Sequence, residues 1–129
     1  FLDPANVPRF RFKMGGRRQL KALGVWEVQY VERQRPTIVT NMRASGSFLV
    51  DAASGAIVQT STLYVDSLGQ SAEIVVQYAK DPTLGMWAPS EMNEVYQNRT
   101  GNLLVKGTAT YSKFRRFQVT TEEKIKIPK

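Results

Sequence analysis

The chain has 129 residues, of which 42% are hydrophobic and 22% are charged, values typical of one soluble globular domain. It contains no cysteine and no histidine, which excludes thiol catalysis, Ser-His triads, disulfides and zinc sites built from thiolate or imidazole ligands. Its 18 Lys and Arg residues outnumber its 11 Asp and Glu residues, and the net charge of +7 favours anionic partners without specifying a fold.

No apolar run is long enough to span a membrane, and the sequence shows no signal peptide. Because the chain begins at Phe1 rather than at a methionine, we expect residues 1–129 to be one domain that forms the C-terminal part of a longer exported protein. The lack of cysteine suits an oxidising compartment, where free thiols are a liability. We therefore expect a periplasmic or secreted location.

The first part of the chain alternates apolar and polar residues, a pattern that predicts half-buried strands. Arg9–Met14 is the first such strand. We expect a tight hairpin at Gly15–Gly16, because glycine readily adopts positive φ. Arg17–Leu23 could form one helical turn, but it is short for a stable helix, and a short strand that ends at Gly24 is preferred.

Val25–Arg33 is the clearest single strand, with Trp26, Val28 and Tyr30 on one face. Pro36 ends it, because proline cannot donate to a strand ladder. Thr37–Thr40 is expected to form a brief edge strand. Two hairpins follow, since clusters of Asp, Ser and Gly separate β-branched and aromatic runs at residues 51–55 and 66–69.

Turn residues at 80–85 and 98–102 predict two further hairpins. Between them, Ser90–Tyr96 could begin a helical turn after Pro89, but its short length between two turns favours a strand. Residues 103–111, 114–121 and 122–128 also alternate. We therefore predict an all-β fold, a single strongly curved antiparallel meander sheet of about eight to ten strands (a partial half-barrel) with little or no helix.

The strongest strands have one apolar and one polar face, and an apolar sheet face must pack against something. The sequence predicts no helix long enough to cover it. The apolar face would then be covered by the curled sheet itself, by a second copy of the chain, by the N-terminal region of the parent protein or by a bound apolar ligand.

The order of features from Arg9 to Ile125 resembles the outer-membrane lipoprotein carrier (LolA-like) superfamily and related uncharacterised exported bacterial proteins. The resemblance rests on Gly24-Val25-Trp26-Glu-Val28, Gly46-Ser-Phe48-Leu-Val50-Asp51-x-x-Ser-Gly55-x-Ile57, Ile74-Val-Val-Gln-Tyr78, Leu84-Gly85-Met-Trp87-Ala-Pro89 with Glu91-Met92, and Gly107-Thr-Ala-Thr-Tyr111-Ser-Lys-Phe114-Arg. It implies a half-barrel with an apolar hollow that carries or senses acyl chains in the periplasm. The N-terminal strands and lid helices of that fold have no counterpart in this sequence.

Two sets of side chains are candidate binding residues. The aromatic set either lines a groove for an acyl chain or forms the core, and consists of Trp26, Tyr30, Phe48, Tyr64, Tyr78, Trp87 and Tyr96. The basic set would form one anion-binding stripe if the first and last strands are neighbours, and consists of Arg9, Arg11, Arg17, Arg18, Arg115 and Arg116. Lipid headgroups or cell-wall polymers are the favoured anions. Nucleic acid is disfavoured, because alternation separates the Phe side chains from the cations.

The carboxylates show no spacing that singles out an acid–base pair, and they include Asp51, Glu73, Glu91 and Glu94. We predict no catalytic residue, metal site or cofactor. The expected function is therefore non-enzymatic: binding of an apolar ligand, such as a lipid or lipoprotein acyl chain, or of a partner protein on the concave face. The alternatives are a structural or dimerisation module without a ligand and a weak polyanion-binding surface.

Overall fold

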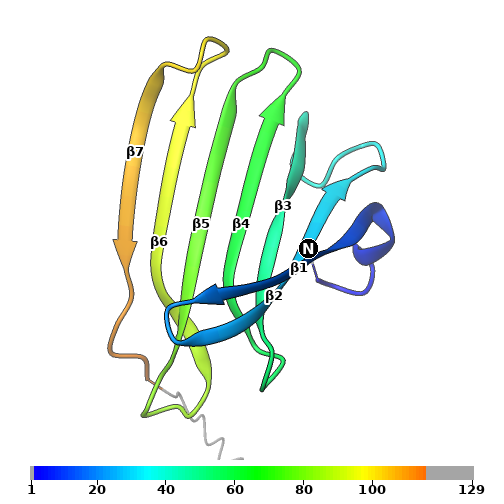
Figure 1. Ribbon diagram of the computed structural model, residues 1–129. Coiled ribbons are helices and arrows are strands. Elements are labelled where there is room, and N and C mark those ends of the chain that lie inside the picture. The colour runs from blue at the N-terminus through cyan, green and yellow to red at the C-terminus, as the bar shows by residue number, and fades with distance from the viewer. Residues whose placement is uncertain (1, 116–129) are drawn as a thin grey trace, which may run out of the picture.

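The computed structural model describes residues 2–115, which form seven strands in one antiparallel sheet. Each strand pairs with the next one in the chain, so the sheet is a simple meander (Figure 1). A single 3-10 turn, η1 (Val7–Arg9), is the only helical element within the described residues. The strands are β1 (Phe10–Leu20), β2 (Leu23–Glu32), β3 (Met42–Asp51), β4 (Ile57–Asp66), β5 (Ser71–Lys80), β6 (Trp87–Gln97) and β7 (Leu103–Thr110).

The predicted all-β antiparallel meander is confirmed, whereas the predicted strong curvature into a partial half-barrel is wrong. The sheet is neither strongly curled nor closed, and β1 and β7 lie at its opposite edges. The β1–β2 hairpin bends across the lower part of β3–β6 in Figure 1. Apolar contacts hold it there, in a cluster that joins Leu20 and Leu23 to Val25, Leu49, Val58 and Trp87.

The described residues hold fewer strands than the eight to ten predicted, and one reason is that Gly15 and Gly16 do not form a turn. They form a bulge within β1, where the register shifts between Met14 and Gly16. The chain turns later, between Leu20 and Leu23. The Glu27 side chain packs against Gly15, where a Cβ atom would collide with it. A glycine pair thus admits a neighbouring carboxylate here instead of reversing the chain.

Three further predicted strands account for the rest of the difference. Residues 37–40 form only one isolated bridge, between Val39 and Met42. The predicted strand at 114–121 lies almost entirely outside the described residues, and the one at 122–128 lies wholly outside them. Ser90–Tyr96, for which a helical turn was the alternative, lies in β6 and is a strand as predicted.

The last four hairpins share one local design, and all four turns are confirmed. Each opens with a side-chain oxygen that accepts hydrogen bonds from backbone N–H groups two to four residues later, as in an Asx-turn; these residues are Asp51, Asp66, Asp81 and Asn98. Each also contains a glycine with positive φ: Gly55, Gly69, Gly85 and Gly101. Such turns form from neighbouring residues alone, which explains why sequence patterns find them.

The strand register defines two faces. One row crosses all seven strands and contains Met14, Val28, Phe48, Thr60, Val76, Met92 and Ala109. We call the side of the sheet that carries this row the apolar face. A row on the other side contains Gln29, Ser47, Ser61, Val75, Asn93 and Thr108. We call that side the polar face.

The core of the apolar face lies over β1–β4 and centres on Tyr30. Its ring stacks on Phe48 at a centroid distance of 4.8 Å and meets the edge of Phe10 at 5.8 Å. Its hydroxyl lies 2.6 Å from Thr62 Oγ1, and burial raises the pKa of this tyrosine despite that hydrogen bond. The side chain reaches Thr62 across Gly46, which has no Cβ to block it.

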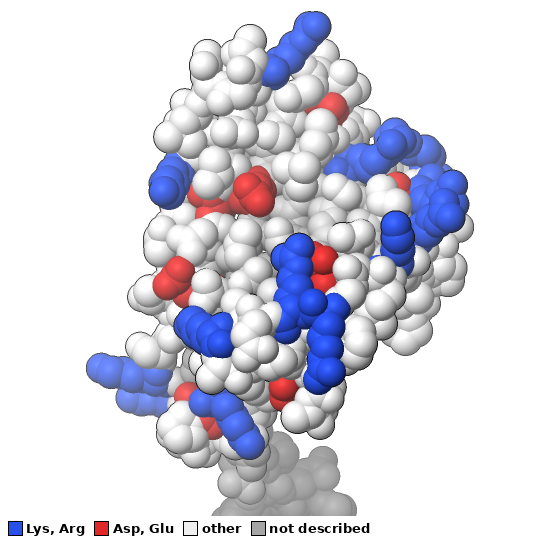
Figure 2. Space-filling model, viewed as in Figure 1, with Lys and Arg blue, Asp and Glu red and all other residues white. Residues whose placement is uncertain are grey.

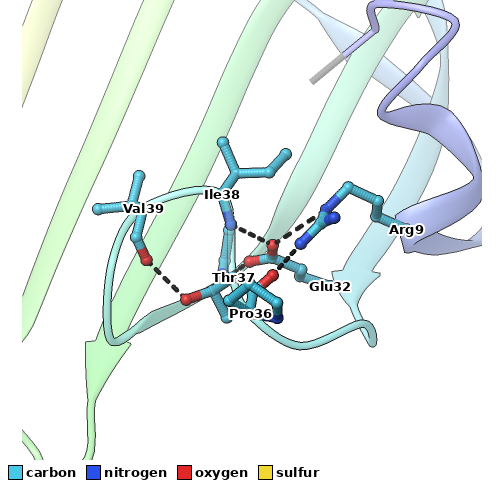
Figure 3. A network of polar contacts seen from close by, with 7 residues as sticks. Arg9, Glu32, Pro36, Thr37, Ile38 and Val39 are labelled. Carbon is cyan, nitrogen blue, oxygen red and sulfur yellow. Dashed lines mark hydrogen bonds and ion pairs between the residues drawn. The ribbon is translucent and has the colours of Figure 1, made fainter.

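A buried carboxylate joins the N-terminal segment to the β2–β3 connection (Figure 3). The Glu32 side chain is fully buried, and its two oxygens accept hydrogen bonds from the N–H groups of Ile38 (2.7 Å) and Ala44 (3.2 Å). Arg9 forms an ion pair with the same carboxylate at 4.0 Å and donates a hydrogen bond to the Pro36 carbonyl. One side chain thereby organises three separate segments.

Candidate ligand-binding face

The apolar face carries two open hollows. The first has a volume of about 370 Å³ and is lined by Leu2, Phe48, Ile57, Thr60, Thr62 and Tyr78. The second has a volume of about 320 Å³, and its apolar lining includes Val39, Met42, Tyr64, Ala72, Ile74, Tyr96 and Leu104. Both volumes are at the lower end of the range for small-molecule sites. The face therefore offers two adjacent places where apolar groups can leave water.

The structure separates the seven predicted aromatic residues into three environments. Tyr30 and Phe48 are buried in the core, although Phe48 also borders the first hollow. Tyr78 lines the first hollow, and Tyr64 and Tyr96 line the second. The remaining two lie elsewhere: Trp26 is exposed on the β1–β2 hairpin, and Trp87 packs on the cluster that holds the hairpin down. A single groove lined by all seven is thus not formed.

The sequence interpretation missed several lining residues, among them Leu2, Ile57 and Thr60. Ile57 and Thr60 belong to a predicted strand. The register shifts between Leu49 and Val50, so that Ile57 pairs with Val50 and Thr60 with Phe48. Strict alternation puts Ile57 and Thr60 on opposite sides, and only a prediction that allowed for this bulge could have placed both on the apolar face. No local signal points to Leu2, because its position depends on how the N-terminal segment folds back. The second hollow likewise draws residues from β3–β7 and from the β2–β3 connection, which no sequence period brings together.

The acidic side chain of Glu94 lies on the apolar face, beside the second hollow. Glu94 pairs with Ile74 on one side and with Gly107 on the other. Its carboxylate lies over Gly107, where a Cβ atom would come within 2.7 Å of it. The Tyr96 hydroxyl donates a hydrogen bond of 3.1 Å to the same carboxylate, and this bond raises the pKa of Tyr96. The second hollow therefore has a polar group close to its apolar wall.

The strand at 114–121 that would carry the second half of the predicted basic stripe lies almost entirely outside the described residues, and within residues 2–115 the first and last strands, β1 and β7, are opposite edges of the sheet. Arg9 and Arg18 form ion pairs with Glu32 and Glu27, at 4.0 and 3.5 Å. The Arg17 guanidinium lies 5.5 Å above the ring of Trp26. The other three predicted residues are divided: Arg11 is exposed on β1, Arg115 is exposed after β7, and Arg116 lies outside the described residues.

The four candidate carboxylates do not gather into one site. Glu91 accepts a hydrogen bond of 2.6 Å from the Asn93 side-chain amide, and Glu73 is exposed on β5. Residues 2–115 contain no group of three or more acidic, Cys or His side chains placed to hold a metal ion. Within that same range no helix has the length and apolar character needed to cross a membrane.

Asp51 illustrates a carboxylate with a structural role. The Ser54 hydroxyl and the N–H groups of Ala53 and Ser54 hold the pKa of Asp51 below its usual value, although burial opposes this. A lowered pKa means that the ionised form stabilises the fold above about pH 3.9 and that this contribution is lost as pH falls through the folded-state pKa. Replacing Ser54 with alanine should therefore raise the pKa of Asp51 toward its usual value.

NMR titration of the side-chain carboxyl resonances measures this shift directly. Ser67→Ala, in the next turn, serves as the control and should leave the Asp51 resonance unchanged. An Asp51 pKa that is the same with and without the Ser54 hydroxyl would contradict this assignment.

Comparison of the chain with protein-family models, with curated proteins and with solved structures found no match.

Proposed function

We propose that this protein is a non-enzymatic, exported β-sheet domain that binds an apolar ligand, such as an acyl chain, on the apolar face. The observation that supports the proposal is the row of Met14, Val28, Phe48, Thr60, Val76, Met92 and Ala109 across all seven strands, flanked by two open hollows. The resemblance to lipoprotein carriers suggests the ligand class. Because the sheet is open, the ligand would lie along the face rather than inside a closed barrel.

The expected affinity is modest. Removing about ten methylene groups from water contributes about 8 kcal/mol at about 0.8 kcal/mol each. The loss of translational and rotational freedom on association offsets part of that gain. We therefore expect dissociation constants in the micromolar range or weaker.

Val76→Glu tests the proposal, because Val76 lies half-buried in the middle of the apolar row. A carboxylate there must lose its hydration when an acyl chain covers it, which is costly. We expect the variant to bind dansyl-undecanoic acid, followed by its fluorescence, at least tenfold more weakly than the unmodified protein. Val75→Glu is the matched control, since Val75 is also half-buried but belongs to the polar face; it should change the dissociation constant less than twofold.

Equal effects of the two substitutions, or no binding of the probe to the unmodified protein, would contradict the proposal. The alternative is a structural module whose apolar face is covered by a second copy of the chain. Exposed apolar side chains on β7 favour it, because Leu103, Leu104 and Val105 are all more than half exposed there and such side chains mark a surface that a second copy can cover. In that case sedimentation velocity would show a dimer and Val76→Glu would dissociate it.

A further inference from the structure

The β1–β2 hairpin exposes apolar side chains at one end of the apolar face, away from the two hollows. Met14 is 60% exposed, Trp26 39% and Phe12 36%. Phe12 and Met14 pair with Tyr30 and Val28, and Trp26 lies two residues before Val28, so all three share one side of the hairpin. We call them the hairpin patch. Exposed apolar groups gathered in this way on a soluble protein mark an interaction surface.

Cations lie on both sides of the hairpin. Arg17 lies over the Trp26 ring on the side of the hairpin patch, and Lys21 occupies the turn, whereas Arg11 and Lys13 alternate with Phe12 and belong to the opposite side of the edge strand. Figure 2 shows Lys and Arg gathered over the region where Figure 1 draws η1, β1 and β2. Within residues 2–115 the ion pairs of this region involve only Arg9 and Arg18. The other cations therefore keep their charge available for a partner.

A hollow of about 630 Å³ lies along the same two strands, and most of its lining belongs to the polar face, because Lys13 pairs with Gln29 of the polar row and Arg11 with Val31. It is lined by Arg11, Phe12, Lys13, Gln29, Tyr30 and Val31. Guanidinium, ammonium and amide groups there can all donate hydrogen bonds to phosphate oxygens. Because β1 is an edge strand, the long side chains of Arg11 and Lys13 can reach around it while their methylene stems stay near apolar surroundings.

We propose that the β1–β2 hairpin docks on a membrane surface that contains anionic lipid. Trp26, Met14 and Phe12 enter the boundary between headgroups and acyl chains, where tryptophan is favoured. Arg11, Lys13 and Lys21 contact lipid phosphates. A lipid surface fits better than a soluble polyanion, because it alone satisfies the apolar centre as well as the cationic rim. The proposal does not depend on ligand binding by the apolar face.

Vesicle co-sedimentation tests the docking. We expect binding to vesicles of phosphatidylcholine and phosphatidylglycerol (3:1) at least tenfold stronger than to phosphatidylcholine alone, since each cation near an anionic membrane strengthens binding about fivefold. Met14→Ser and the double variant Arg11→Ser/Lys13→Ser should each weaken binding at least fivefold. Leu103→Ser and Lys106→Ser change an equally exposed apolar residue and a cation on the opposite edge, β7, and should have no effect.

Tryptophan fluorescence locates the contact. With Trp87→Phe, the remaining Trp26 should shift its emission to shorter wavelength on anionic vesicles and be quenched by brominated lipid. With Trp26→Phe, the remaining Trp87 should show neither effect. Val76→Glu tests ligand binding by the apolar face and should leave vesicle binding unchanged. The membrane-docking proposal and the ligand-binding proposal can therefore be contradicted independently of each other. Thermal unfolding followed by circular dichroism confirms that each variant is folded.

Three results would overturn the docking proposal. One is an absence of binding to anionic vesicles. Another is binding that the Met14 substitution leaves unchanged while the loss of Arg11 and Lys13 abolishes it, which would indicate a polyanion site. The third is quenching of Trp87 instead of Trp26, which would place the contact elsewhere.

Discussion

Replacing Glu32 with alanine should lower the free energy of unfolding by about 3–5 kcal/mol, the range for removal of one partner from a buried charge network. The substitution leaves the N–H groups of Ile38 and Ala44 without their acceptor and Arg9 without its ion-pair partner. Unmade hydrogen bonds of buried groups are costly in themselves. Since domains are stable by only about 5–15 kcal/mol, such a loss is a large fraction of the total.

Urea unfolding followed by circular dichroism measures this effect. Glu32→Gln should be milder, because its amide oxygen can still accept one of the two backbone hydrogen bonds. Glu73→Ala, at an exposed position on β5, is the control and should stay within about 0.5 kcal/mol of the unmodified protein. A loss below about 1 kcal/mol for Glu32→Ala would mean that the network contributes little to stability.

Gly46→Ala is expected to cost about 3 kcal/mol or more, at the upper end for overpacked sites. A Cβ atom at this position would overlap the Ser61 carbonyl oxygen and lie 2.9 Å from the Tyr30 hydroxyl oxygen. The first of these is a backbone atom of the paired strand, so β3 and β4 would have to move apart. That movement would also disturb the hydrogen bond between Tyr30 and Thr62.

Gly24→Ala is the matched control within the same sheet. Its Cβ atom would meet only the end of the Arg17 side chain, at 3.9 Å. Because this glycine does not have positive φ, alanine should be neutral or slightly stabilising. Thermal unfolding would contradict the argument if both substitutions shifted the midpoint by the same amount.

About half of the candidate site could be predicted from the sequence. Alternation placed Val28 and Tyr30 on one face of their strand, and the strand register then aligns Val28 with Phe48 and Val76 across the sheet. Alternation did not show that the Tyr30 side chain is buried in the core or that Trp87 packs against the cluster that holds the β1–β2 hairpin. Burial of a strand residue depends on what lies above the sheet, and that information comes from segments distant in the chain.

The sequence by itself determined the antiparallel meander, its four last turns and the two-sided character of its strands, because each depends on residues within a few positions of one another. The tertiary structure alone decided that Gly15 and Gly16 make a bulge, that the β1–β2 hairpin bends over β3–β6, and that Glu32 is buried among three segments. Alternation along the sequence predicts to which face of its strand a side chain belongs. It does not predict how far neighbouring strands bend or which side chains from distant segments come into contact.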